Sequence, residues 1–344
     1  MRRAVLARLG AVALLAACAR AGPGPAPLTP VTAPRPPELR VSRLALGTLV
    51  EIVVRDSDTV RGRAAIESGF AEIERLEGLL SEWRESSEIS RVNRSAGDGW
   101  LLLSPETAQA LGAARAIAEA SGGAFDPTVL PLVRLWGFAG GTPRVPDARE
   151  LAAARARVGW RGLELDPQAP RARLAHSGMA VGLGGIGKGF IGDRVAAKLR
   201  ALGVPAALVK ASGDLAFYGG TPERPWPLAI EDPEHPGESL AELERLAGGV
   251  STSAQTQRFF EAVGRRYGHV IDPRSGRPAD HARSVTVVAD TATLSDGWST
   301  ALFVMGEEAP AFVQRHPELL AVIVRSDGSR FVSAELPVRW TPGP

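Results

Sequence analysis

The length, composition and charge of the chain limit what it can be. Its 344 residues, 44% of them apolar, suffice to bury one large core or two fused cores, so we expect a globular body of enzyme size. The formal net charge is only +2, and three of the arginines lie in the first seventeen residues, which leaves −1 on the remaining chain. This balance excludes a strongly basic surface, so we expect no nucleic-acid partner.

The first seventeen residues have the features of a secretory signal peptide. An arginine-rich start is followed by apolar residues 9–16 and a small-residue cleavage site at 15–17, and the apolar run is too short to span a membrane. Cys18 comes next, and residues 15–18 resemble the lipobox of bacterial lipoproteins. As the only cysteine, Cys18 cannot form an internal disulfide and is better explained as a lipidation site than as a redox group. The alternative is a chance cysteine in an ordinary signal peptide.

The sequence that follows Cys18 predicts a tether. Residues 21–37 contain seven prolines and two glycines without an apolar period, which is typical of an extended segment of roughly 3.1 Å per residue. We therefore predict a signal peptide at 1–17, a lipidated cysteine with its tether at 18–40, and one folded domain at 41–335. We expect the protein to be exported and lipid-anchored to a bacterial membrane, facing the periplasm.

Helix and strand patterns alternate through the rest of the chain. Apolar spacing of 3.6 residues and capping residues mark the helices, and glycines mark several of their ends. The predicted helices are 66–80, 104–122, one that starts at 147, one from the glycine cluster to 203, 295–305 and 308–315. The predicted strands are 44–54 (interrupted at 47–48), 207–210, 228–231, 284–289 and 320–325. With no repeat and no convincing linker after residue 40, this mixture predicts a single compact α+β body.

The glycine cluster at residues 182–189 matches two phosphate-binding patterns, G-x-x-x-x-G-K and G-x-G-x-x-G. We interpret both matches as coincidental, because Gly189 stands where a P-loop needs Ser or Thr and no convincing buried strand precedes the cluster. Glycines still allow a backbone to approach a phosphate, and Lys188 at a helix start would add charge. Lysine is rare here, with three lysines against thirty-seven arginines, although a tight turn with a surface lysine remains the alternative.

Asp296 and Thr300 are the clearest candidates for a metal site. They are four residues apart in a predicted helix, so they share one face and can offer two hard oxygens to one Mg²⁺ ion, with Ser299 close enough to assist. His269 begins an apolar segment that leads into a Pro/Gly turn. A lone histidine of this kind is more often structural than catalytic, but beside a metal site it would supply a base.

Aromatic and hydroxyl residues occupy several predicted loops. Phe125, Trp136 and Phe138 could clamp a flat ring, although core packing is the commoner fate of such side chains. Residues 212–214 and 251–254 are rich in hydroxyls, and each alone is more often a structural turn than a site.

Taken together, these segments resemble the ApbE family of FAD:protein FMN transferases. The resemblance covers about residues 44–325, with six motifs in the order of the family. They are 81–83 with 87–93, 123–129 with 131–133 and 135–138, 187–190 with Asp193, 212–214, 269–278 and 296–300. The implied fold is a single α+β body related to the T-fold.

The resemblance also implies the roles of individual residues. Mg²⁺ would be held by Asp296, Thr300 and a main-chain oxygen placed at Gly185, with a further contact from Ser299. FAD would touch Leu46, Trp83, Ala124, Phe125, Asp126, Lys188, Val270 and Ile271. His269 matches the family histidine that acts as a base.

Four positions depart from the family pattern. The chain has Leu46 for the usual Met, Trp83 for Tyr, Gly182 for Asp, and Ala254 for Gly. Trp83 can still stack on a flat ring. At Gly182, by contrast, a carboxylate that could hydrogen-bond the cofactor is missing.

The function implied by the resemblance is Mg²⁺-dependent transfer of FMN from FAD to a Ser/Thr hydroxyl of a partner protein, with release of AMP. The partner would be an exported or membrane-bound flavin-accepting subunit of an electron-transfer complex, with an acceptor motif of the type D-x-x-[ST]-G-A-[ST]. Two alternatives remain open: an FAD pyrophosphatase that gives FMN and AMP, and a flavin-binding lipoprotein without turnover. A metal site and a base argue against the second, because simple binding needs neither.

Overall fold

A computed structural model describes residues 36–255, 258–262 and 264–341. The predicted signal peptide, Cys18 and the tether as far as residue 35 lie outside the described residues. The folded body begins earlier than the predicted residue 41, because strand β1 (Glu38–Ala45) pairs along its whole length with β2 (Thr48–Arg55). Among the described helices, none is both long and apolar enough to cross a membrane.

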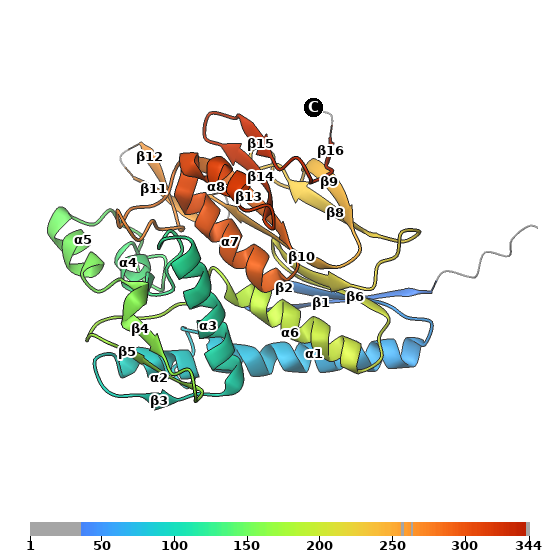
Figure 1. Cartoon of the computed structure of the whole chain (residues 1–344), viewed down its shortest axis with the longest axis horizontal. Coiled ribbons are helices and arrows are strands. Elements are labelled where there is room, and N and C mark those ends of the chain that lie inside the picture. Colours follow the sequence, from blue (N-terminus) through green and yellow to red (C-terminus); the bar gives the residue numbers. More distant parts are fainter. Residues whose placement is uncertain (1–35, 256–257, 263, 342–344) are drawn as a thin grey trace, which may run out of the picture. The chain divides into compact units, whose positions relative to one another are not determined.

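An antiparallel sheet of eight strands lies at the centre of the body (Figure 1). Its strand order is β1-β2-β6-β7-β10-β13-β14-β15. The further strands of this sheet are β6 (Ala206–Ala211), β7 (Asp214–Tyr218), β10 (Gly248–Ala254), β13 (Ala282–Ala289), β14 (Leu320–Arg325) and β15 (Arg330–Val332). Because every neighbouring pair is antiparallel, neither nucleotide-binding pattern in the glycine cluster has the parallel βαβ unit that it requires.

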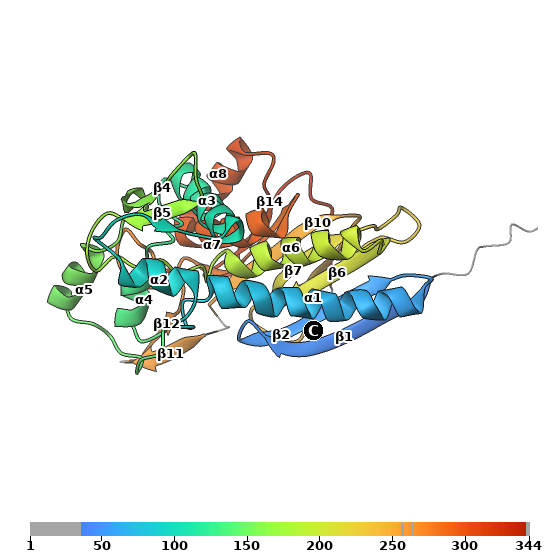
Figure 2. The same ribbon diagram turned by 90° about the horizontal axis from the view of Figure 1, so that it is seen from below.

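Helices cover one face of this sheet, and α1 and α6 run side by side along it (Figure 2). They are α1 (Thr59–Leu80), α6 (Gly187–Ala201) and α7 (Ala292–Met305), with α3 (Pro105–Ala120) packed against α7. The buried stripe of α1, including Ile66, Ile73 and Leu76, meets Ile52 of the sheet in the largest core. This apolar period of 3.6 residues is the one that predicted the helix.

A second, smaller sheet covers the opposite face of the large sheet. It has the strand order β16-β9-β8, with β8 (Trp226–Glu231), β9 (Ser239–Arg245) and β16 (Arg339–Trp340). Along β8, Trp226, Leu228 and Ile230 are buried and their neighbours are exposed, which is the alternation expected of a half-buried strand. Because β16 belongs to this sheet, the body extends beyond the predicted end at residue 335.

The remaining elements form a lobe beside the helices and a short C-terminal helical segment. They are α2 (Glu88–Arg94), β3 (Leu101–Leu102), α4 (Leu130–Leu135), α5 (Ala148–Arg155), η1 (Trp160–Gly162), β4 (Leu163–Leu165), β5 (Arg171–Leu174), β11 (Phe259–Ala262), β12 (Arg265–Gly268), η2 (Gly306–Glu308) and α8 (Ala309–Arg315). Trp136 is fully buried in this lobe and donates its indole N–H to the carbonyl of Gly276 over 2.9 Å. Trp136 is therefore a core residue that anchors the 269–278 segment.

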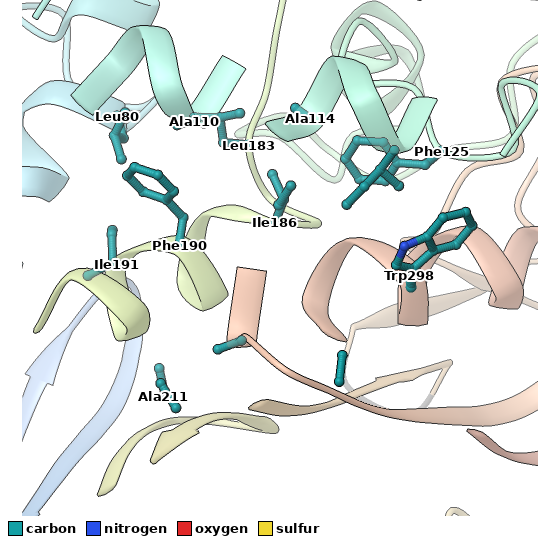
Figure 3. Packing of buried hydrophobic residues seen from close by; sticks show 14 of the residues in the cluster. Leu80, Ala110, Ala114, Phe125, Leu183, Ile186, Phe190, Ile191, Ala211 and Trp298 are labelled. Atoms are coloured by element: carbon teal, nitrogen blue, oxygen red, sulfur yellow. The ribbon is translucent and has the colours of Figure 1, made fainter. Parts of the chain in front are cut away.

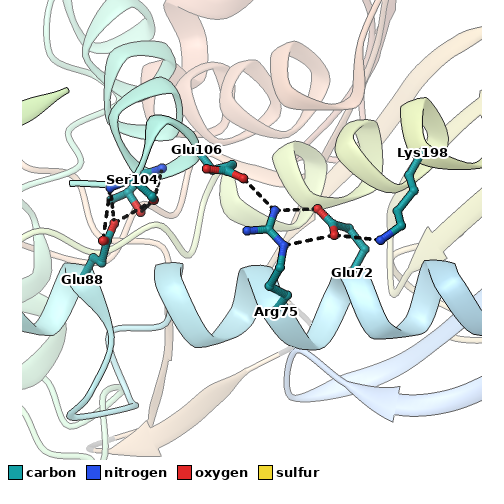
Figure 4. Close-up of polar contacts among 7 residues, drawn as sticks. Glu72, Arg75, Glu88, Ser104, Glu106 and Lys198 are labelled. Atoms are coloured by element: carbon teal, nitrogen blue, oxygen red, sulfur yellow. Dashed lines mark hydrogen bonds and ion pairs between the residues drawn. The ribbon is translucent and has the colours of Figure 1, made fainter. Parts of the chain in front are cut away.

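An ionic network ties α1 to its neighbours (Figure 4). Arg75 donates to Glu72 and to Glu106 of α3 over 2.7 Å each, and Lys198 of α6 reaches Glu72 over 3.2 Å. The Arg75 guanidinium lowers the pKa of Glu72 to about 2 in spite of its burial. The network thus joins α1 to both α3 and α6.

Two local predictions are wrong. The interrupted strand at 44–54 is the inner part of a hairpin, because Leu46 and Gly47 both adopt positive φ, 54° and 69°, and reverse the chain between β1 and β2. The hydroxyl-rich segment 251–254 is the end of strand β10 rather than a turn, since it pairs with β13 throughout. The strands predicted at 207–210, 228–231, 284–289 and 320–325 are confirmed as β6, β8, β13 and β14.

Candidate functional site

Three loop ends meet at one edge of the large sheet. Val50 of β2 lies opposite Ala211 of β6, and Asp214 of β7 lies opposite Ser251 of β10. The β1–β2 turn, the β6–β7 turn and the end of β10 therefore share this edge. Leu46 and Ser212, one in each turn, are the non-glycine residues with positive φ in the described part of the chain. Such strained backbone concentrates at functional sites.

The glycine loop, residues 181–186, reaches this edge from the helical side. Asn93 fixes its start, because its side chain donates to the carbonyl of Val181 over 2.9 Å and accepts from the same residue's N–H over 2.7 Å. Leu183 and Ile186 point into the core, where Figure 3 shows them among Phe125 and other apolar side chains. The loop is thus held at both ends.

Helices α6 and α7 are locked together next to the loop. A Cβ on Gly189 would lie 2.1 Å from the carbonyl oxygen of Ala292, so only glycine allows this approach. The N–H of Gly189 donates to Oδ2 of Asp296 over 2.9 Å. Asp193 of α6 accepts the N–H groups of Ala292 and Thr293, which caps the start of α7. This contact places Asp296 at the first turn of α6.

The predicted metal ligands converge at this point. Thr300 Oγ1 is 3.5 Å from the carbonyl oxygen of Gly185, and a Cβ on Gly185 would lie 2.9 Å from the same hydroxyl. Ser299 shares a hydrogen bond of 2.9 Å with Ser253 of β10, which also lies 3.4 Å from Thr300. Asp296 stands one helical turn before Thr300 on the same face of α7.

The donor set favours a hard cation. The described residues contain no group of three or more His, Cys, Asp or Glu side chains that could bind a metal. One carboxylate, a hydroxyl and a carbonyl oxygen are instead the ligands that Mg²⁺ accepts, with water completing its coordination. The residues present therefore fit the predicted ion.

Lys188 supplies the positive charge of the site. It forms an ion pair with Asp214, at the start of β7, and lines a small pocket together with Asp214 and Leu46. Burial acts to lower the pKa of Lys188, but the charges of Asp214 and Asp296 outweigh it and hold the ammonium protonated. Burial, reinforced by the neighbouring Asp214 charge, raises the pKa of Asp296. A bound cation would stabilise the ionised form of this buried carboxylate.

His269 is the first residue of the 269–278 segment, directly after β12, and it is half-buried. Its backbone N–H donates to the carbonyl of Arg258 over 3.1 Å, and its Nδ1 lies 3.2 Å from the same oxygen. A ring N–H at Nδ1 satisfies this contact and leaves the lone pair on Nε2. Burial lowers the pKa of His269 to about 4, with help from the charges of Arg258 and Lys188. The ring is therefore a neutral base at physiological pH.

The residues predicted to touch FAD fall into two groups. Trp83 is 56% exposed and Leu46 is half-buried, so both side chains are open to a ligand. Phe125 and Ile271 are buried, and the carboxylate of Asp126 accepts hydrogen bonds from Thr128 and from the N–H of Trp160. Of the two possibilities considered for Phe125 and Trp136, core packing is confirmed, because both side chains are buried.

The second group is buried, and it comprises Ala124, Phe125, Asp126 and Ile271. Val270 is half-buried, so it is less exposed than Trp83 and more exposed than Ile271. None of these FAD contacts is tested by the structure, and they stay predictions.

Three residues near the site carry no prediction from the sequence. Ser253 lies in a segment predicted as a turn. Glu82 lies within the quoted motif at 81–83, beside Trp83, and its carboxylate faces the glycine loop. No pattern in the sequence indicates Arg258, because its carbonyl oxygen meets His269 only when the β11–β12 hairpin between them has formed.

Comparison with known proteins decides the family. The family model described as "ApbE family" matches residues 46–324, a range that contains all the site residues named above. The chain belongs to the ApbE family. This membership confirms the resemblance seen in the six motifs, and the α+β body is the ApbE fold.

Curated ApbE relatives resemble the chain over most of its length. It is 32% identical over 332 residues to an FAD:protein FMN transferase of Klebsiella pneumoniae (strain 342), covering 94% of this chain and 93% of that protein. It is also 32% identical over 304 residues to the FAD:protein FMN transferase of Treponema pallidum (strain Nichols), covering 83% and 84%.

Solved ApbE structures share the fold. The ApbE protein of Thermotoga maritima superposes with a TM-score of 0.81 at 32% identity, covering 87% of this chain and 97% of that chain. The flavinyl transferase ApbE of Pseudomonas stutzeri, in its apo form, gives 0.77 at 32% identity, covering 89% and 95%.

Proposed function

We propose that the protein transfers FMN from FAD to a serine or threonine hydroxyl of a partner protein and releases AMP. The observation that carries the proposal is the convergence of Lys188 with the oxygens of Gly185, Asp296 and Thr300 at one sheet edge. The neutral ring of His269 lies within reach of the Lys188 charge, which helps to lower its pKa. Curated relatives named FAD:protein FMN transferase support it. Phosphoryl chemistry needs this combination of charge neutralisation and positioning.

Asp296, Thr300 and the carbonyl of Gly185 would hold Mg²⁺, and Ser299 would add a further contact. Ser253 lies between the hydroxyls of Ser299 and Thr300, 2.9 Å from the first and 3.4 Å from the second. When bound, the ion would polarise phosphate oxygens and offset the negative charge of the pyrophosphate. Lys188 adds a second positive charge beside it. Its ion pair with Asp214 keeps the ammonium in place before the substrate arrives.

His269 is proposed to remove the proton from the attacking hydroxyl. With Nδ1–H directed at the carbonyl of Arg258, the lone pair of Nε2 is available for that proton. The hydroxyl oxygen forms a bond to the FMN-side phosphorus, and the bond from this phosphorus to the bridging oxygen breaks. The bridging oxygen leaves with AMP, to which the proton can pass. FMN remains on the partner as a phosphoester.

The test is the mass of an acceptor. A small carrier with the motif D-x-x-[ST]-G-A-[ST] is incubated with the protein, FAD and Mg²⁺, and a carrier with alanine in place of the motif's hydroxyl residues is the control. The proposal expects one added FMN on the first carrier and none on the second. Free FMN with AMP and an unmodified carrier would favour the pyrophosphatase, and uncleaved FAD would favour a binding protein.

We further propose that the protein is exported and anchored through a lipid on Cys18, and that its partner is an exported or membrane-bound flavin-accepting subunit of an electron-transfer complex. The support is the lipobox-like sequence before Cys18 and the proline-rich segment after it. We expect Cys18→Ala to move the protein from the membrane fraction to the periplasmic fraction on immunoblots. An unchanged membrane fraction would contradict the anchor.

A further inference from the structure

Glu82 is a half-buried acid that lies against the glycine loop. Its Oε1 is 3.5 Å from the position of a Cβ on Gly182 and 4.0 Å from that of a Cβ on Gly184. The hydroxyl of Ser90 in α2 donates to the carbonyl oxygen of Glu82 over 3.4 Å, and this hydrogen bond holds the backbone that carries the acid. The carboxylate is therefore held next to the segment that presents Gly185.

No internal cation neutralises this carboxylate by contact. The nearby acids Glu77 and Glu88 pair with arginines, whereas none of the ion pairs in the described part of the chain involves Glu82. Burial raises the pKa of Glu82. Hydrogen bonds from the backbone N–H groups of Glu82 and Leu183 oppose this shift, and the more distant charges of Arg134 and Arg258 add to that effect. A carboxyl group placed in this way has acceptor capacity left for a donor from outside the chain.

The surroundings indicate what that donor belongs to. Trp83, the next residue in the chain, exposes an aromatic face of the kind on which a flat ring stacks. The glycine loop lies against Glu82 and continues into α6, whose second residue is Lys188. A ligand that spans these groups must combine a flat ring, N–H or O–H donors and phosphate. FAD has all three.

We propose that the carboxylate of Glu82 binds FAD by accepting a hydrogen bond from one of its N–H or O–H groups. This inference rests on the proposed function. Gly182 gives the inference its structural basis, because the Glu82 carboxylate lies in van der Waals contact with the position where a side chain at residue 182 would begin. Glu82, in the segment before α2, thus supplies the carboxylate that is absent at position 182.

The first test is the dissociation constant of FAD, measured by quenching of its fluorescence in Mg²⁺ buffer before measurable cleavage. Glu82→Gln keeps the size of the side chain but removes its charge, and we expect FAD to bind at least about tenfold more weakly, as for a lost charged hydrogen bond. Glu85→Gln, an exposed glutamate of the same segment, is the matched control and should bind FAD like the wild type.

Titrations with ADP and FMN distinguish the two halves of FAD as the source of the donor. Weaker binding of ADP alone places the donor on the adenosine half, and weaker binding of FMN alone places it on the flavin half. Wild-type affinity of Glu82→Gln for FAD, ADP and FMN would overturn the inference. A wild type that does not bind FAD would instead overturn the proposed function, and the inference with it.

A double variant that moves the acid from position 82 to position 182 tests the placement of the carboxylate independently of folding effects. Gly182→Asp alone would bring a second carboxylate against that of Glu82, so we expect weaker FAD binding through repulsion. Glu82→Ala alone should also weaken binding. The double variant should bind FAD more tightly than either single variant, because its one acid lies in the same space. Additive losses in the double variant would contradict the inference.

Discussion

At the scale of single residues, the site depends on groups whose surroundings set their protonation. His269 is neutral because it is half-buried near two cations, and Lys188 is charged because two carboxylates face it. The identities of His269, Lys188, Asp296 and Thr300 could be read from the sequence, since they stand in recognisable spacings. Their protonation could not, because it depends on neighbours such as Arg258 that long-range folding brings in.

The acid limb of the rate profile tests the role of His269. A base with the usual histidine pKa near 6.5 loses activity below that pH, whereas a pKa lowered to about 4 keeps the ring unprotonated down to about pH 5. At saturating Mg²⁺ we expect kcat/KM for transfer, which reports the groups of the free enzyme, to fall on the acid side only as the pH approaches 4. His269→Gly should reduce kcat by at least about 100-fold and leave FAD affinity largely intact.

A fall in kcat/KM centred near pH 6.5 in the wild type would contradict this prediction. Turnover of His269→Gly at the wild-type rate would show that another group takes the proton.

Asp296 is tested by the concentration of Mg²⁺ that half-saturates the transfer rate. Asp296→Asn keeps an oxygen for the N–H of Gly189 but removes the charge, so we expect this concentration to rise at least about tenfold while the fold is retained. Asp290→Asn, an exposed acid two residues before α7, is the control and should titrate like the wild type. Equal Mg²⁺ dependence of all three proteins would exclude Asp296 as a ligand.

At the scale of elements, the helices were better predicted than the strands. The helix signals, caps and a period of 3.6 residues, are local, and they predicted α1, α3, α6 and α7. Strand β10 was mistaken for a turn because its serines gain their place only between β7 and β13, which are distant in sequence. The hairpin at Leu46 was missed for a related reason, since its outer strand β1 begins within the predicted tether and ends within the predicted strand 44–54.

The contact between α6 and α7 gives a prediction at this scale. Gly189→Ala would place a methyl group against the carbonyl of Ala292, so the two helices must separate, and we expect a loss of about 1–3 kcal/mol in the free energy of unfolding. Gly78→Ala is the matched control, because a Cβ there meets nothing within 4 Å inside α1, and it should stabilise by about 0.5–1 kcal/mol. Urea unfolding measures both, and equal effects would contradict the packing argument.

At the scale of the whole folded body, the antiparallel sheet gathers distant segments at one edge. The turns at residues 46–47 and 212–213, the end of β10 and the starts of α6 and α7 together carry the proposed site. The α+β class and the single body could be predicted from the alternation of patterns. The order of the strands in the sheet could not be predicted, because neighbouring strands such as β2 and β6 are separated in the sequence by all the elements from α1 to α6.

The most direct test of the central claim is the fate of solvent oxygen during the reaction. The transfer is run in ¹⁸O-labelled water with FAD, Mg²⁺ and the carrier, and the masses of AMP and of the modified carrier are measured. If the carrier hydroxyl attacks the FMN-side phosphorus, neither product contains ¹⁸O. Incorporation of ¹⁸O into FMN or AMP would show that water is the nucleophile and would contradict transfer as the reaction of this site.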